Sequence, residues 1–246
     1  MSDVTGQPQT CISCGNTGTG TFCNNCGQTY HIKRISLKSI LHDVFHFFTH
    51  LEKGFGYTVK QLIIAPGTMQ REYIRGIRAR YQKPFSMLFL CISINALLRY
   101  WISHLLVKYY HSSSDTEADF YHTYQMFLYM IFVPLTAVLN WIIFRKEKYN
   151  YAEMAVIQLY MFSLIFLAVI PIFMLRFIWH ELDTAYIEFP LITIYSIVTS
   201  LKLYTLEKKW VVVIKSLVLI CVLFLLIQVL EDDIIGWLQN LKSAGH

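Results

Sequence analysis

Long apolar runs separated by short polar connections fill the chain after Pro84. Each run is close to the roughly 20 residues that an α-helix needs to cross a bilayer. We place the runs at residues 85–107, 124–144, 154–178, 189–206 and 211–230. The pattern predicts an all-α integral membrane protein with about five transmembrane helices.

Composition agrees with a chain that lies mostly in lipid. Of its 246 residues, 55% are hydrophobic and 15% charged, and the mean hydropathy is +0.43. A soluble domain has fewer apolar and more charged residues. We expect four parts: a head at 1–30, a basic juxtamembrane segment at 31–83, a transmembrane domain at 84–230 and a short tail at 231–246.

The connections between the runs differ in charge, and this difference predicts the orientation. Basic residues precede the first run and fill the second and fourth connections, as at Lys146 and Lys208, whereas the first and third are acidic, as at Glu117 and Glu188. Cytoplasmic loops carry the excess of Lys and Arg. The N-terminus is therefore expected in the cytosol and the C-terminus in the periplasm.

The head carries two near-identical cysteine pairs, each followed by glycine. The first reads Cys11-Ile12-Ser13-Cys14-Gly15, and the second reads Cys23-Asn24-Asn25-Cys26-Gly27. Four thiolates at this spacing suit tetrahedral Zn²⁺ and leave no open position for water. We therefore expect a structural zinc ribbon, folded by its metal.

Disulfides and a redox-active cysteine pair are the competing interpretations of this head. Met1 to Thr10 is polar and lacks the apolar core of a secretory signal, so we expect the head to stay in the reducing cytosol. A thioredoxin-like pair would need a βαβ context that this sequence lacks. Both features favour metal binding.

Three short helices are predicted between the head and the first run. Ser36 can cap a helix at 37–52, a second helix can run over 57–64, and Pro66-Gly67 makes a firm break. Thr68 is placed to cap a third helix at 69–81. The segment as a whole is amphipathic and basic, as expected of a membrane surface.

Five basic residues near the third helix form a candidate site for lipid phosphates. They are Arg71, Arg75, Arg78, Arg80 and Lys83, the first three at spacings of four and three residues. One interpretation is a grip on anionic lipid of the inner leaflet. The alternative is a plain positive-inside anchor before the first span.

Three histidines on the first predicted helix raise the question of a second metal site. His42, His46 and His50 recur at intervals of four and fall on one stripe. Two histidines at this spacing can share a metal, and an open site could be catalytic. We favour the simpler interpretation, the polar edge of an interfacial helix.

Polar groups inside the first run are further candidates. Arg99 is a charge within the run, with Asn95 one turn earlier. An intramembrane ionisable group can mark a pore or substrate site, but a long side chain near a helix end can also reach the headgroups. Pro134 and Pro171 lie within the second and third runs, where they can kink a helix or simply pack.

The order of motifs resembles a known family. The two cysteine knuckles are followed by Gly54-Phe55, then by Pro66-Gly67, Arg71-Glu72-Tyr73-Ile74 and Gly76-Ile77-Arg78, and then by Tyr81 and Pro84. This order resembles the bacterial family catalogued as domain of unknown function 3667. The resemblance implies a Gram-negative inner-membrane protein of the Bacteroidota type, and it implies no catalytic residue.

Three classes of function fit these features. We favour a non-enzymatic scaffold or sensor whose zinc ribbon recruits a protein partner at the cytosolic face, with anionic lipids as further partners. An integral-membrane enzyme acting on a lipid or lipid-linked substrate would use the histidine stripe and the basic helix. A small transporter or channel would use Asn95 and Arg99. The formal charge of +5 does not indicate nucleic acid, because the basic residues lie beside apolar runs.

Overall fold

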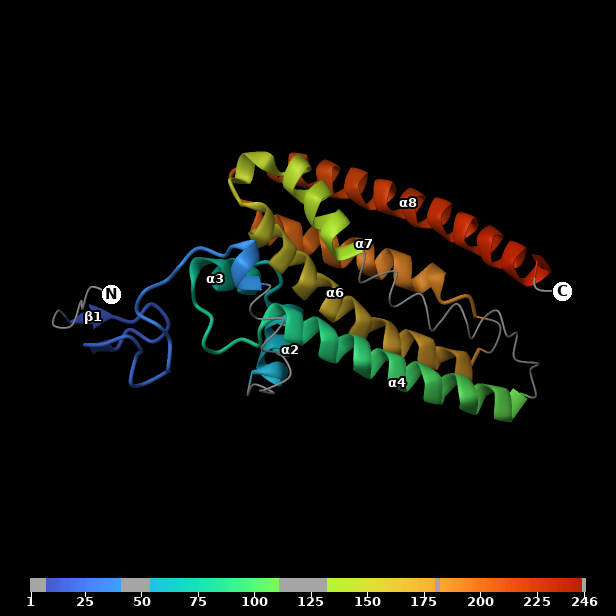
Figure 1. The fold of residues 1–246 in the computed structure, drawn as a ribbon, viewed down its shortest axis with the longest axis horizontal. Helices are drawn as coiled ribbons and strands as arrows, with labels where there is room; N and C mark the ends of the chain where they lie inside the picture. The colour runs from blue at the N-terminus through green and yellow to red at the C-terminus, as the bar shows by residue number, and fades with distance from the viewer. Residues whose placement is uncertain (1–7, 41–53, 111–131, 180–181, 245–246) are drawn as a thin grey trace.

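The computed structural model describes residues 8–40, 54–110, 132–179 and 182–244. Within these ranges the chain is mostly helical. Long helices lie side by side, and a small cysteine-rich head projects from one end of them (Figure 1). The C-terminus lies at the opposite end (Figure 1).

Four helices in the described part of the chain are long and apolar enough to cross a membrane. They are α4 (Pro84–Tyr110), α6 (Tyr151–Met174, continued by the 3₁₀ turn η3, Leu175–Phe177), α7 (Ala185–Leu203) and α8 (Lys209–Ala244). They correspond to the first, third, fourth and fifth predicted spans. The described part of the chain is thus mostly helical, with four candidate membrane-spanning helices, and the predicted fold class is confirmed to that extent.

The second predicted span, at 124–144, is only partly covered. Residues 124–131 lie outside the described residues, and the remainder forms the shorter apolar helix Phe132–Ile143. The total of five spans therefore stays a prediction. Pro134 lies near the start of this helix, whereas Pro171 is inside α6 as expected.

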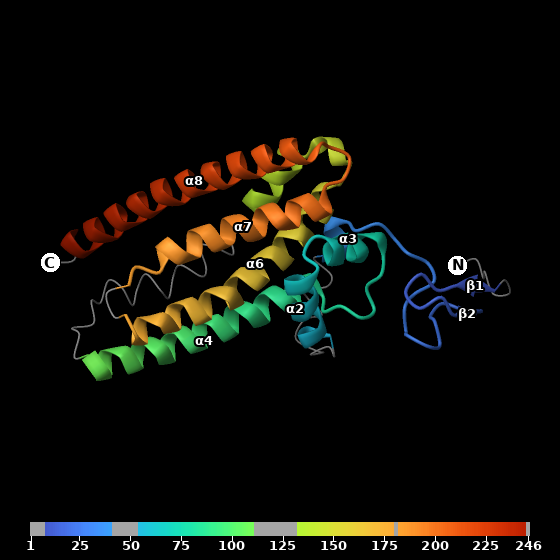
Figure 2. The same cartoon turned by 180° about the vertical axis from the view of Figure 1, so that it is seen from behind.

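Helix α6 is the centre of the bundle. In its most apolar stretch 67% of the residues are buried, against 17% in α7 and in α8. It packs on α4 and on α7, and α7 packs on α8, as the view from behind also shows (Figure 2). Its buried Tyr160, Leu159 and Leu164 join the core with Leu88 of α4. The outer faces of α7 and α8 expose apolar side chains, as expected of helices in lipid.

The sequence explains where α6 begins. The side chain of Asn150 accepts a hydrogen bond from the backbone N–H of Glu153, and the Glu153 carboxylate accepts one from the N–H of Asn150. This capping box satisfies two N–H groups that the first turn would leave without partners. The helix therefore has a fixed start at the end of the bundle that carries the head.

A buried carboxylate joins two connections at this same end. Glu147 lies in the short turn η2 (Arg145–Glu147), and it accepts hydrogen bonds from the N–H groups of Thr205, Leu206 and Glu207, over 2.9–3.1 Å. The carboxylate of Glu207 in turn lies 2.6 Å from the ammonium of Lys215 on α8. The connection before α6 and the connection between α7 and α8 are thus held together.

In its described part, the juxtamembrane segment holds the helices α2 (Phe55–Ile64) and α3 (Thr68–Arg75), with the predicted break at Pro66-Gly67 between them, besides the helical turn that follows Ser36. The predicted extent of the third helix, to residue 81, is wrong. Gly76 adopts a left-handed conformation with φ of 110° and caps the helix there. Thr68 is the first helical residue and not the cap, since Gly67 occupies that position.

Gly67 shows why this break fits closely against the bundle. Its φ of 74° favours glycine, and a Cβ at this position would overlap the carbonyl oxygen of Thr199 and come within 2.9 Å of the N of Leu203. Both neighbours belong to α7. The start of α3 is therefore packed directly against the backbone of a candidate membrane span.

Another predicted helix is described only at its start, and one further predicted boundary differs from the structure. The first helix begins after Ser36 as expected, with Ser36 and Ser39 exchanging side-chain to backbone hydrogen bonds, but residues 41–53 lie outside the described residues. At the other end of the chain, α8 does not end near residue 230. It continues through most of the predicted tail, as far as Ala244.

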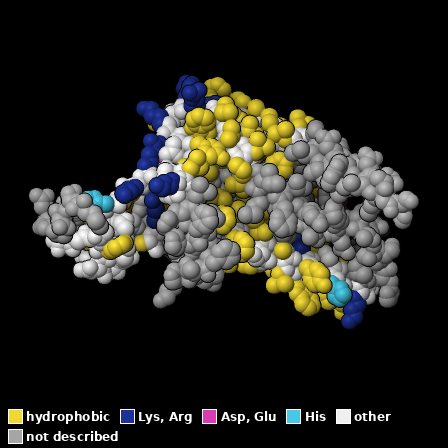
Figure 3. All heavy atoms as spheres, viewed as in Figure 1, with side chains coloured by type: hydrophobic (Ala, Val, Ile, Leu, Met, Phe, Trp, Pro, Cys, Tyr) yellow, Lys and Arg dark blue, Asp and Glu magenta, His cyan; other side chains and the backbone are white. Residues whose placement is uncertain are grey.

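The head is a pair of small hairpins. Strands β1 (Gln9–Thr10) and β2 (Thr17–Gly18) pair antiparallel around the first cysteine pair, and a single bridge joins Phe22 to Thr29 around the second. The head lies beyond the ends of the bundle where α4, α6 and α8 begin (Figure 1). Lys and Arg side chains gather where the head meets the helices, and apolar side chains cover much of the described surface of the helices in this view (Figure 3).

Candidate metal centre

Two backbone turns of the same shape present the four cysteines. In the first, the N–H of Gly15 donates to the carbonyl of Cys11 over 2.9 Å, and in the second Gly27 donates to Cys23 over 2.8 Å. Both glycines have positive φ, 75° and 73°. A side chain would strain this conformation, which explains the glycine after each cysteine pair.

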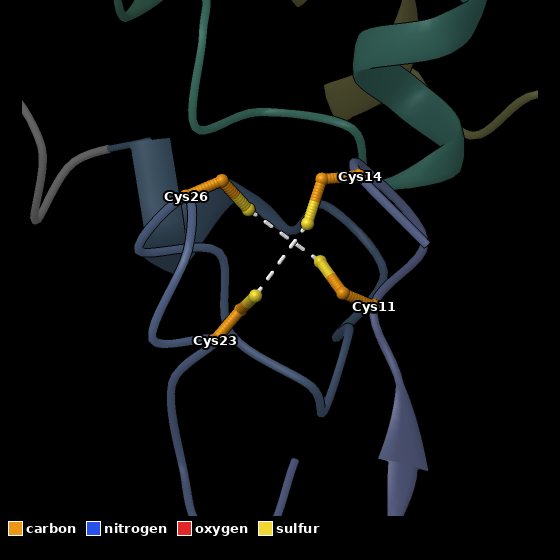
Figure 4. A group of neighbouring side chains, drawn as sticks. All are labelled: Cys11, Cys14, Cys23 and Cys26. Atoms are coloured by element: carbon orange, nitrogen blue, oxygen red, sulfur yellow. Dashed lines mark hydrogen bonds between the residues drawn. The ribbon is translucent and has the colours of Figure 1, made fainter. Parts of the chain in front are cut away.

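The four sulfurs converge on one point (Figure 4). All lie within 4.8 Å of one another, with the sulfurs of Cys11 and Cys26 separated by 3.5 Å and those of Cys14 and Cys23 by 3.6 Å. A tetrahedral ion with bonds of about 2.3 Å to sulfur sets its ligands about 3.8 Å apart. The cluster therefore fits a metal ion with four cysteine ligands.

Two thiols of the cluster, those of Cys23 and Cys26, differ in pKa. Backbone N–H groups, first that of Cys26, stabilise the thiolate of Cys23 and lower its pKa to about 6. The N–H of Gln28 acts to lower the pKa of Cys26, but desolvation and the neighbouring thiols outweigh it and raise this pKa to about 12. Four adjacent sulfurs cannot all carry a charge without a compensating cation. A bound divalent ion would supply that charge.

The other predicted metal ligands are three histidines. His42, His46 and His50 lie outside the described residues, so the second site stays a prediction. Among the residues that the structure describes, the cysteines are the group of three or more His, Cys, Asp or Glu side chains whose ligand atoms meet. Cys91 lies apart from this cluster and is buried in α4.

Gln28 connects the second cysteine turn to the juxtamembrane segment. Its carbonyl accepts the N–H of Cys23, and its side-chain oxygen accepts the backbone N–H groups of Arg78 and Ala79 over 3.0 and 2.9 Å. Only 5% of the residue is exposed. The metal-binding turn is thereby joined to the chain just before α4.

Arg34 makes a second connection, to the start of α6. Its guanidinium donates to both carboxylate oxygens of Glu153, over 2.7 and 2.9 Å, and to the carbonyl of Lys148. Next to it, the side chain of Asn150 donates to the carbonyl of Ile35. The linker that follows the head is therefore held by the capping box of a candidate membrane span.

The five predicted phosphate ligands do not share one helix face. Arg71 and Arg75 lie on α3, whereas Arg78, Arg80 and Lys83 follow its end at Gly76. The guanidinium of Arg78 turns back and donates to the carbonyls of Tyr73 and Lys33, each over 3.1 Å. That they bind phosphate stays a prediction.

Asn95 and Arg99 face the interior of the bundle. The Asn95 amide donates to the carbonyl of Phe166 on α6 over 2.6 Å. A guanidinium nitrogen of Arg99 lies 3.6 Å from the carboxylate of Glu188, and the group stacks 4.7 Å over the ring of Phe173. We expected Glu188 in a loop, but it lies in the first turn of α7. A pore or substrate role for Asn95 and Arg99 stays a prediction.

Sequence reasoning missed Gln28, Arg34, Glu153 and the partner of Arg99. For Glu153 a signal was present, since Asn150 followed three residues later by glutamate before an apolar run is typical of a capping box. For Arg99 and Glu188, a shared depth near the same end of their spans was the available clue. Nothing in the sequence around Gln28 indicates that its side-chain oxygen accepts hydrogen bonds from two backbone N–H groups.

Comparison with known protein families finds a match for part of the chain. Residues 52–95 match the family described as "Protein of unknown function (DUF3667)", a region that holds α2, α3 and the first half of α4 but not the cysteine turns. No curated protein and no solved structure matches the chain. The family match confirms the resemblance expected from the sequence: residues 52–95 are similar to the DUF3667 family of proteins of unknown function.

Proposed function

We propose that this chain is a multi-pass protein of the bacterial inner membrane in which a structural zinc ribbon forms a fixed, non-enzymatic platform at the cytosolic face. The platform recruits a protein partner, as a scaffold or a sensor. The observation that carries this proposal is the double attachment of the ribbon, through Gln28 to residues 78–79 and through Arg34 to Glu153. A head fastened at two points holds its outer surface in one position.

Zinc is the metal that suits this site best. Four soft sulfur ligands in a tetrahedral arrangement favour Zn²⁺ over the hard cations, which prefer oxygen. Because the four cysteines occupy every position around such an ion, no coordination site is left for a substrate or an activated water. The centre therefore supports a structural role.

The proposed orientation of the protein in the membrane rests on the positive charge at the end of the bundle that carries the ribbon. The connection before α6 holds Arg145, Lys146 and Lys148, and the connection before α8 holds Lys208 and Lys209. Loops rich in Lys and Arg stay in the cytosol. Alkaline phosphatase joined after His246 should be active, whereas the same enzyme joined at Lys208 should be inactive. The opposite result would reverse the orientation.

The outer surface of the ribbon offers apolar side chains to a partner. Ile12 lies inside the first cysteine turn and is 49% exposed, and Phe22 lies just before the second and is 59% exposed. In the proposed arrangement these two side chains lie in the interface with the partner, where buried aromatic anchors contribute most of the binding energy.

Site-specific crosslinking tests this recruitment. A photo-crosslinking residue at Phe22, in cells of the native host, should yield one discrete protein adduct. The adduct should disappear when the four cysteines are replaced by serine. A crosslinker at Ile194, which is exposed on α7, serves as the control for contacts in the membrane. Equal protein adducts at both positions, or an adduct that survives the cysteine replacement, would contradict the proposal.

A further inference from the structure

A pocket of about 650 Å³ lies between the ribbon and the ends of two membrane spans. The second cysteine turn contributes Cys26 to Thr29, and the segment before α4 contributes Arg78 to Lys83, with Gln82 excepted. Phe85 of α4 and Val156 and Leu159 of α6 also line it, together with residues of the segment 35–40, Gly54 and Tyr73. Pockets of this volume accommodate small-molecule or lipid-headgroup ligands.

One side of the pocket is positively charged. Arg78, Arg80 and Lys83 line it, and no carboxylate is among the described residues of its wall. The partners of the Arg78 guanidinium, the carbonyls of Tyr73 and Lys33, are neutral. Arg80 remains 3.8 Å from Glu72, whose carboxylate already accepts a hydrogen bond of 2.7 Å from the Tyr81 hydroxyl. The described residues of this wall therefore include three cations and no carboxylate.

The other side of the pocket is apolar and belongs to the membrane spans. Phe85 is in the first turn of α4, and Val156 and Leu159 are in the first three turns of α6. These turns lie where a span leaves the headgroup region and enters the hydrocarbon. A ligand that fills the pocket would thus meet cations at one end and apolar side chains at the other.

We propose that this pocket binds an anionic phospholipid, with its phosphate between Arg80 and Lys83 and the start of its acyl chains against Phe85, Val156 and Leu159. Guanidinium and ammonium groups form strong, charge-assisted hydrogen bonds with phosphate oxygens. The apolar wall favours a phosphate that carries acyl chains over a soluble phosphate compound. Arg71 and Arg75, which the sequence grouped with these residues, do not line the pocket.

Lipid titration of the purified full-length protein in detergent tests this site. The probes are dioctanoyl phosphatidylglycerol, dioctanoyl phosphatidylcholine and inorganic phosphate, with binding followed by native mass spectrometry. We expect the phosphatidylglycerol to bind most tightly. The Arg80→Gln/Lys83→Gln variant should weaken its binding by about thirtyfold, since each basic group near lipid contributes about a factor of five.

The matched control removes two charges from the same segment but outside the pocket. Arg71→Gln/Arg75→Gln should leave phosphatidylglycerol binding nearly unchanged. Ala79→Trp, at an exposed residue of the pocket wall, should block binding while all charges remain. Retained thermal stability and metal content show that each variant is folded, and the single variant Arg80→Gln replaces the double variant if that one is not.

Three results would overturn the proposal. Equal weakening in the two double variants would mean that diffuse charge, and not the pocket, attracts the lipid. Equal affinity for phosphatidylcholine would exclude recognition of a net negative headgroup. If inorganic phosphate bound as tightly as the phosphatidylglycerol, the site would belong to a soluble phosphate compound and not to a phospholipid.

Discussion

The guanidinium of Arg34 and the carboxylate of Glu153, 119 residues apart in the sequence, face each other through two hydrogen bonds of 2.7 and 2.9 Å. The Glu153 side chain is only 4% exposed, whereas that of Arg34 is 63% exposed. Glu153 also completes the capping box of α6. One carboxylate thus both starts a candidate membrane span and holds the linker of the cysteine-rich head.

Removal of this contact should loosen the linker and leave the metal centre intact. Arg34→Gln takes away a charge-assisted pair whose net contribution we expect to be about 1 kcal/mol, because one partner is exposed. Hydrogen exchange followed by mass spectrometry should show faster exchange over residues 28–36. Lys38→Gln is the charge-matched control, since Lys38 is exposed on the same segment. Equal exchange in both variants would contradict the attachment.

Gln28 should stabilise the contact between the ribbon and residues 78–79 through its side-chain oxygen and not through its volume. Gln28→Leu leaves the N–H groups of Arg78 and Ala79 without their acceptor and should destabilise the contact by about 2 kcal/mol. Gln28→Glu keeps an acceptor oxygen, so it should destabilise the contact much less than Gln28→Leu does. Exchange of the amides at residues 78–79 reports the difference. If both variants exchanged alike, the two hydrogen bonds would not hold the ribbon.

The break before α3 should not tolerate a side chain. Gly67→Ala places a Cβ against the backbone of Thr199 and Leu203 at a positive φ, so we expect a loss of about 2 kcal/mol and a lower thermal unfolding midpoint in detergent. Gly56→Ala is the control, because a Cβ at Gly56 in α2 meets no atom within 4 Å. An unchanged midpoint for Gly67→Ala would show that α3 is not packed on α7 in this way.

Arg99 and Glu188 should be coupled in their contributions to stability. The side chains are 14% and 21% exposed, and they join α4 to α7. Arg99→Leu or Glu188→Leu alone leaves a charge inside the bundle and should cost about 3 kcal/mol. The double variant Arg99→Leu/Glu188→Leu should cost less than either single variant.

Thermal unfolding of the four proteins in lipid nanodiscs measures this coupling as a double-mutant cycle. If the losses from the two single variants simply added in the double variant, the ion pair would contribute nothing. A snorkelling Arg99 would give that additive result, because the side chain would then lie in the headgroups.

The helical part of the fold was predictable because its signal is local. An apolar run of about 20 residues specifies a span without reference to any other segment, so α4, which starts at Pro84, agrees with the predicted 85–107 to within a few residues. The cysteine turns were predictable for the same reason. Ligand spacing and the following glycines, Gly15 and Gly27, lie within a few residues of one another.

What escaped prediction depends on contacts between distant segments. The third helix ends at Gly76 and not at residue 81, where the sequence shows several residues that also suit a helix. A Cβ at Gly76 would overlap the side chain of Ile32, from the linker that follows the ribbon. The contacts of Arg34 with Glu153 and of Arg99 with Glu188 likewise join segments whose proximity only the folded chain defines.

Metal content of the purified protein is the most direct test of the central claim, that a four-cysteine metal centre organises the head. Elemental mass spectrometry should find one zinc per chain in the wild type and none after Cys11, Cys14, Cys23 and Cys26 are replaced by serine. Replacement of His42, His46 and His50 by alanine should leave that zinc in place. A wild-type protein that contains no metal when purified without chelators would contradict the account.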